Sequence, residues 1–159
     1  MPSLRSYRAA DWDSFLALEL ETGLAALRRA PQEEQDAFAA RWATDLKTAW
    51  GWGDVGPKKD NSLLLVLEHE GAFAGHLWLC EELDAFSGAK RLWVLTVAIV
   101  ESFRSRGWGR LLMERAVEEA KSRKLASVGL SVAADNIVAR KLYEEMGFES
   151  TRLSMFRRV

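Results

Sequence analysis

The sequence lacks the residues that several classes of site require. It has one cysteine, Cys80, and two histidines, so it offers neither an internal disulfide nor the ligands of a usual zinc site. Lys and Arg number 22 against 23 Asp and Glu, and this balance gives no basic surface for nucleic acid. The longest apolar run, 92–100, is far short of the roughly 20 residues of a membrane helix. We therefore expect no metal site, no nucleic-acid partner and no membrane attachment.

The first residues also predict no secretory leader. The first residues, MPSLRSYRAADWD, contain no apolar core of the kind that a signal peptide needs, so we expect the protein in the cytoplasm. A length of 159 residues fits one domain better than two. A content of 48% hydrophobic and 28% charged residues is typical of a globular protein. We therefore expect a single domain, 1–159, with a core of its own.

Hydrophobic periodicity predicts helices in the first third of the chain and mostly strands after it. The stretch 51–61 holds turn formers and no period, which predicts a loop. The predicted elements are a strand at 3–8, a helix from Asp11 or Asp13, a helix from Pro31 to Trp50, strands at 62–68, 72–81 and 92–100, a helix at 107–123, a strand at 126–132, a helix from Asp135 or Asn136 to Met146, and one or two closing strands within 148–159. This order predicts an α/β fold built on a mixed sheet.

The junction after the apolar strand 92–100 carries the first functional signal, the pattern R-x-x-G-x-G at Arg104, Gly107 and Gly109. Glycine lets main-chain N–H groups approach an anion. The first N–H groups of a helix have no partner within it and lie at the positive end of its dipole. Such a turn suits a pyrophosphate, with Arg106 and Arg110 as further cations. A plain tight turn is the other interpretation of these glycines.

Two nucleotide-binding motifs fit this junction poorly. A dinucleotide fingerprint needs a third glycine and a position directly after the first strand of its unit. A P-loop needs Lys and then Ser or Thr after its last glycine, where this chain has Arg110 and Leu111.

A second block, LSVAADNIVARKLYEEMGF at 130–148, follows on a strand and a helix. It contains Asn136, Ala139, Tyr143, Gly147 and Phe148 in the spacing N-x-x-A-x-x-x-Y-x-x-x-G-F. With these two motifs in this order, the chain from about Leu63 to Phe156 resembles the GNAT superfamily of N-acetyltransferases. The resemblance implies a mixed, mostly antiparallel sheet with splayed central parallel strands, flanked by helices.

The resemblance also implies acetyl-CoA as co-substrate. Main-chain groups of the strand would pair with its pantetheine arm, and the glycine turn would hold its pyrophosphate. Asn136 would contact the pantetheine, although a plain helix cap explains it equally well. The cofactor-binding residues implied in this way are Val97, Ala98, Ile99, Arg104, Ser105, Arg106, Gly107, Trp108, Gly109, Arg110 and Asn136.

Tyr143 matches the family's general acid, which protonates the departing thiolate. A phenol with a pKa near 10 is a reasonable donor to a thiolate of pKa about 8.5–9. A core tyrosine is the alternative. The acceptor implied is a small-molecule amine or a protein N-terminus or lysine, and a homodimer is one candidate assembly.

The chain departs from the family at the general base. Relatives carry a carboxylate on the fourth or the fifth strand, where this chain has Trp93 and Ser131. Neither residue removes a proton at neutral pH. The remaining candidates are ordered water, bulk solvent, or a carboxylate from the third strand or the first helix, namely Glu81, Glu82, Asp84 or Glu21.

Two further questions stay open in the sequence. Trp50 and Trp52 are flanked by glycines and are candidates for an acceptor pocket or a dimer surface, while Trp42 is expected in the core. Acidic residues including Glu19 would suit a cationic amine if they converge. The missing strand carboxylates favour an alternative function, a non-catalytic acyl-CoA-binding sensor or regulatory module.

Overall fold

The computed structural model describes residues 1–159 apart from the side chain of Asp60. Its strands are β1 (Ser3–Ser6), β2 (Leu63–His69), β3 (Ala72–Leu83), β4 (Lys90–Ile99) and β5 (Val128–Leu130), and its α-helices are α1 (Trp12–Ala26), α2 (Gln32–Ala49), α3 (Trp108–Ser122) and α4 (Ile137–Glu145). The strands form one sheet in the order β1-β2-β3-β4-β5. All neighbours are antiparallel except β4 and β5, which are parallel. The predicted mixed, mostly antiparallel sheet with flanking helices is confirmed.

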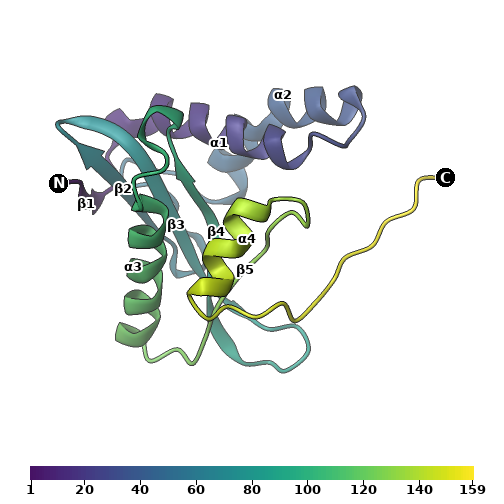
Figure 1. Ribbon diagram of the computed structural model, residues 1–159. Coiled ribbons are helices and arrows are strands. Elements are labelled where there is room, and N and C mark those ends of the chain that lie inside the picture. Colours follow the sequence, from purple (N-terminus) through teal and green to yellow (C-terminus); the bar gives the residue numbers. More distant parts are fainter.

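The helices cover the two faces of the sheet (Figure 1), and the alternation of side chains along β2 shows why. Leu65 and Leu67 face the cluster that contains Leu112 and Met113 of α3. Leu64 and Val66 face the opposite way, toward Phe15 of α1 and Leu46 of α2. Both faces are apolar, so the sheet is a central layer with a core on each side.

The β2–β3 hairpin turns at Glu70 and Gly71, between the strands that the sequence predicts at 62–68 and 72–81. Both residues have positive φ, 52° and 79°, which is the geometry of a type I′ turn and matches the twist of two antiparallel strands. The hairpin joins β2 to β3 in the register that places His76 of β3 opposite Val66 of β2.

Strand β4 is irregular in its second half. Its pairing with β3 shifts register between Trp78 and Leu79, so Leu95 lies unpaired as a bulge. On its other side β4 pairs with β5 only at Leu92 to Val94. Beyond the bulge the two parallel strands separate, and the main chain from Leu95 to Ile99 has no strand partner on the β5 side among the described residues.

Two predicted strands differ in the structure. The strand expected at 126–132 is limited to β5, Val128–Leu130, because β4 bends away at its bulge and leaves later residues without a partner. The closing strands expected within 148–159 were a wrong prediction, since these residues form no regular structure and are almost all exposed.

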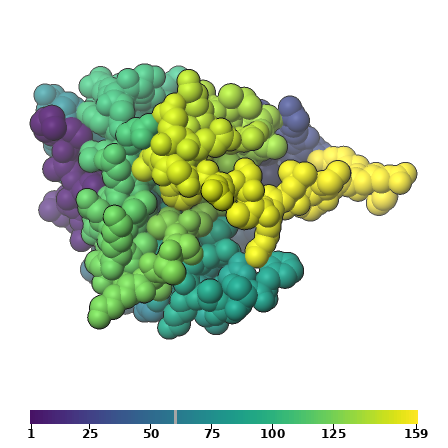
Figure 2. Space-filling view, turned by 60° about the horizontal axis from the view of Figure 1, so that its bottom comes forward, coloured from purple at the N-terminus to yellow at the C-terminus, as the bar shows by residue number. Residues whose placement is uncertain are grey.

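The physical reason for the second error lies in where the C-terminal segment is anchored. The short edge of β5 offers few main-chain groups for a further strand. Side chains of the segment bind elsewhere instead, Arg152 to Asp84 and Arg158 to Glu34 of α2. The segment therefore projects from the body of the molecule (Figures 1 and 2).

Candidate active site

The separation of β4 from β5 opens a cavity of about 220 Å³ between β4, α3 and α4. Its lining is apolar except for one amide and one phenol, and consists of Val97, Ile99, Gly109, Met113, Asn136, Val138, Ala139, Leu142 and Tyr143. The cavity thus brings together the predicted general acid, Tyr143, and three residues predicted to bind the cofactor, Val97 and Ile99 of the strand and Gly109 of the glycine turn. An apolar groove beside free strand groups is suited to an extended chain that hydrogen-bonds like an added strand.

The N-terminus of α3 is open at one end of this cavity. Gly107 is its N-cap with φ of 79°, no side chain caps it, and its first turn has no acidic residue. Ser105 also has positive φ, 62°, so the turn directs successive N–H groups outward. A Cβ built on Gly107 meets no heavy atom within 4 Å. Packing therefore does not require glycine here, and the open space and unpartnered donors fit a phosphate group.

The arginines of the turn are held by protein partners. Arg104 donates from Nε to the carbonyl oxygen of Ile99 at 3.0 Å and pairs with Glu21 of α1. Arg110 pairs with Glu145 at 2.7 Å. Arg104 and Arg106 are exposed, and Arg110 is half-exposed. They lend positive charge to the turn, while the close donors to an anion are the main-chain N–H groups.

Aromatic rings brace the same turn. The ring of Trp108 stacks on Phe103 with centroids 5.6 Å apart and contacts His69. The Arg106 guanidinium lies 5.4 Å from the Phe103 ring centroid and 5.3 Å from that of Trp108. The side chains of Arg106 and Trp108 thus pack against the turn and support it.

Asn136 caps α4, with its Oδ1 accepting from the Ala139 N–H at 3.2 Å. This confirms the cap, and the amide nitrogen is left to donate to a ligand in the cavity that Asn136 lines. Tyr143, two turns further along α4, lines the same cavity. Burial raises the pKa of the Tyr143 phenol above its usual value of 10. The phenol is therefore protonated at neutral pH and is able to donate.

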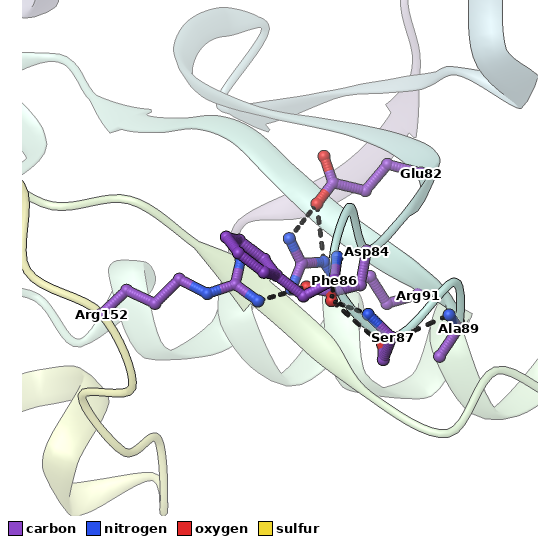
Figure 3. Close-up of polar contacts among 7 residues, drawn as sticks. All are labelled: Glu82, Asp84, Phe86, Ser87, Ala89, Arg91 and Arg152. Carbon is purple, nitrogen blue, oxygen red and sulfur yellow. Dashed lines mark hydrogen bonds and ion pairs between the residues drawn. The ribbon is translucent and has the colours of Figure 1, made fainter.

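The carboxylates expected on β3 lie at the other end of the strand and are bound to arginines. Glu81 pairs with Arg123 at 3.1 Å, and Glu82 pairs with Arg91. Asp84 accepts from Arg91 and Arg152 and from main-chain N–H groups of the β3–β4 turn (Figure 3). The N–H of Ser87 contributes most to holding the pKa of Asp84 well below its usual range. None of the three lines the cavity.

A buried pair of an acid and a histidine is the feature that the sequence does not predict, although Glu19 itself is a candidate acid. Glu19 of α1 is 3% exposed and His76 of β3 is fully buried, with 2.7 Å between Glu19 Oε1 and His76 Nε2. One signal was available, because Glu19 lies four residues after the buried Phe15 and so shares its inward helix face. No comparable signal marks His76, which is 57 residues away in sequence, as its partner.

Three tryptophans, Trp42, Trp50 and Trp52, pack against the core cluster on the α1 side and do not line the cavity. Trp52 packs against Phe15 and Trp78 with centroids 5.0 and 5.7 Å away, and its Nε1 donates to the Tyr7 hydroxyl. Trp50 packs on Trp78, and Trp42 belongs to the same cluster. The acceptor-pocket interpretation of Trp50 and Trp52 therefore finds no support in their packing.

The described residues form neither a metal-binding cluster nor a membrane-spanning helix. No three His, Cys, Asp or Glu side chains among them gather in a way that would hold a metal ion. Within the same residues, every helix is too short or too polar to cross a membrane.

Comparison with known proteins gives a consistent result. The sequence model of the Acetyltransferase (GNAT) family matches residues 23–148. A relative from Salmonella typhimurium named as a [Ribosomal protein bS18]-alanine N-acetyltransferase is 31% identical over 127 residues, which cover 80% of this chain and 77% of that protein. An uncharacterised N-acetyltransferase of Bacillus subtilis, YycN, is 26% identical over 57% of each chain.

Solved structures agree in fold. A putative acetyl transferase from Pyrococcus furiosus superposes with a TM-score of 0.79 at 23% identity over the whole of both chains. A ribosomal-protein-alanine N-acetyltransferase from Brucella melitensis gives 0.69 at 17% identity over 99% of each. With the family model covering most of the sequence, the chain belongs to the GNAT family of acetyltransferases.

Proposed function

We propose that the chain, as one domain over 1–159, transfers an acetyl group from acetyl-CoA to a primary amine by direct attack. The observation that carries this proposal is the free main-chain edge of β4 beside the uncapped N-terminus of α3. Tyr143, which lines the same cavity, adds a proton donor to this arrangement. An extended pantetheine, a diphosphate and a leaving thiolate each have a matching group there.

The residues divide the work by their chemistry. N–H groups at Ser105 to Arg110 hold the pyrophosphate, with dipole and arginine charge behind them. Val97, Ala98 and Ile99 present their main chain to the pantetheine, and Asn136 donates from its free amide nitrogen. The bound co-substrate supplies a thioester as the acyl electrophile.

Main-chain donors near the β4 bulge stabilise the negative charge that develops on the carbonyl oxygen. The new bond joins the amine nitrogen to the acyl carbon, and the bond from that carbon to sulphur breaks. The Tyr143 phenol gives its proton to the departing thiolate, and the proton that the acylated nitrogen loses restores the phenol. The raised pKa of Tyr143 keeps that proton available throughout the neutral range.

The relatives guide the choice of acceptor. The Salmonella relative is named for an alanine of a ribosomal protein, so a peptide with an N-terminal alanine is the first acceptor to test. Polyamines, free amino acids and aminoglycosides complete the panel.

The experiment measures free thiol released from acetyl-CoA with each amine and the mass of the product. Amine-dependent thiol release with a product heavier by one acetyl group supports the proposal. The residues Trp93 and Ser131 in place of strand carboxylates favour the sensor as second candidate. Acetyl-CoA binding without thiol release from any amine would favour that sensor.

A further inference from the structure

The buried pair of Glu19 and His76 is a charged site that the proposed acyl transfer has not used so far. A separation of 2.7 Å between Oε1 and Nε2 requires a proton between the two atoms, because a carboxylate oxygen and an unprotonated ring nitrogen repel. The Thr96 hydroxyl of β4 lies 3.1 Å from the same Nε2. Helix α1 and strands β3 and β4 thus each contribute one polar group to a single cluster.

Among the described residues, no further charged side chain pairs with this cluster. The rings of Phe15 and Phe73 face the imidazole, with centroids 4.8 and 6.3 Å away. No described Lys, Arg, Asp or Glu other than Glu19 pairs with His76. His76 Nδ1 is buried without a partner. The carboxylate therefore lies in apolar surroundings with an imidazole as its one ionisable neighbour. Burying such a pair costs desolvation free energy and adds little stability, so stability alone does not explain it.

The second carboxylate oxygen of Glu19, Oε2, is able to accept a further hydrogen bond. Its Oε1 is bound to His76, and no described residue hydrogen-bonds to Oε2. A carboxylate accepts through both oxygens. His76 and Thr96 hold one end of the group, and the other end is left to receive a proton.

The position of the cluster relates it to the cavity. Along β4 successive side chains point to opposite faces, so Val97 and Ile99 line the cavity while Thr96 faces α1. The cavity side belongs to the co-substrate between α3 and α4. Glu19 does not itself line the cavity, but it lies behind β4 on the α1 side, and an amine that approaches the thioester from that side comes toward it.

Helix α1 is also tied to both walls of the cavity. Glu21, two residues after Glu19, pairs with Arg104 of the glycine turn. Arg28 and Arg29, just beyond α1, pair with Asp135 before α4 at 2.7 and 2.9 Å. Ion pairs thus link α1 and the loop after it to the segments that lead into α3 and α4.

We infer that Glu19 is the proton acceptor for the amine, and that His76 and Thr96 are positioning residues that hold its carboxylate. The inference rests on the proposed amine transfer. In the step, the ammonium gives one proton to Glu19 Oε2, directly or through one water, and becomes a neutral amine. That amine attacks the thioester carbonyl, and Tyr143 protonates the thiolate as the bond from carbon to sulphur breaks. The proton that the acylated nitrogen then loses restores the Tyr143 phenol, and Glu19 later releases its own proton to solvent.

The experiment compares pH–rate profiles of Glu19→Gln and wild type between pH 6 and 10, with the best amine of the panel. The amide keeps the size of the side chain and its acceptor for His76 but takes up no proton. We expect kcat/KM for the amine to fall at least tenfold at pH 7, which is a modest share of what general bases contribute. The loss should shrink toward pH 10, where the free amine no longer needs a base, while the KM for acetyl-CoA stays within twofold.

Asp13→Asn, an exposed carboxylate on the same helix, is the matched control and should follow the wild-type profile. A loss in Glu19→Gln that is equal at every pH, or no loss at all, would overturn the inference and leave the acetyltransferase standing. Absence of transfer by wild type would instead remove the proposed function. Should Glu19→Gln fold poorly, His76→Gln replaces it, and a profile identical to that of wild type would then count against the inference.

Discussion

The two faces of strand β4 differ in what they pack against. On one face Val97 and Ile99 border an open cavity between α3 and α4. On the other face the space beside the sheet is filled by rings, among them Phe15, Trp52 and Trp78. Protein interiors are normally close-packed, so an apolar face left open beside free strand groups indicates a ligand. The packed face supports the sheet and holds the Glu19–His76 pair on the α1 side.

The largest expected effect comes from blocking the open face. Gly107→Glu places bulk and negative charge where the pyrophosphate is proposed to lie. We expect a loss of acetyl-CoA affinity of at least a thousandfold, about 4 kcal/mol, measured by calorimetry. The control is Gly88→Glu, at a glycine that also has positive φ and open space around it but lies in the β3–β4 turn. Equal binding by the two variants would remove the phosphate from this turn.

The next effect belongs to the packed face. Trp52→Ala removes a ring that contacts Tyr7, Trp12, Phe15 and Trp78. We expect a loss of about 3 kcal/mol in the free energy of unfolding, which is a drop in Tm of roughly 6–12 °C. Acetyl-CoA affinity and the KM for the amine should be unchanged. Trp52→Phe should recover part of the stability. A raised KM for the amine at unchanged Tm would instead make Trp52 part of an acceptor pocket.

A smaller effect separates the two tyrosines of the chain. Tyr143→Phe should lower kcat at least tenfold, about 1.4 kcal/mol, with acetyl-CoA affinity within a few fold. Tyr7→Phe is the control, because its hydroxyl serves only the Trp52 Nε1 in the core, and we expect it to lose stability of about 1 kcal/mol but no turnover. Unchanged kcat in Tyr143→Phe at saturating substrates would remove the phenol from the mechanism.

The smallest effect concerns the C-terminal segment. The pKa of Asp84 is lowered in the folded state, chiefly by the Ser87 N–H. The stabilisation is therefore present above the unfolded pKa near 3.9 and is lost as pH falls below it. Asp84→Asn should flatten the acid dependence of Tm, with a drop at pH 7 of less than about 4 °C.

The same variant releases Arg152, so trypsin should cleave after Arg152 faster than in wild type. Glu34→Gln frees only Arg158 and should leave cleavage at Arg152 unchanged. Wild-type cleavage and wild-type acid sensitivity in Asp84→Asn would show that Asp84 does not anchor the segment.

Local chemistry explains which parts of the fold were predictable from sequence. The turn at Glu70 and Gly71, the cap at Asn136 and the glycine N-cap of α3 are each determined by a few adjacent residues. Their positions were correct to within one or two residues. The predicted meeting of Val97 and Tyr143 at one cavity came from the family resemblance.

Long-range pairing explains what was missed. Glu19 and His76 are 57 residues apart, and nothing near either residue signals the other. The ion pairs that engage Glu81, Glu82 and Asp84 are likewise set by how strands align and not by the acids themselves. The apolar residues of 148–159 suggested strands, but a strand needs a partner edge, and the three residues of β5 do not supply a long one.

Hydrogen exchange of the main-chain amides with and without acetyl-CoA tests the central claim most directly. The proposed binding predicts slower exchange confined to the β4 edge from Leu95 to Ile99 and to the turn from Ser105 to Arg110. The amides beneath α1, around Trp78, should not change. Protection that spares the turn and the β4 edge, or none at saturating acetyl-CoA, would contradict the account.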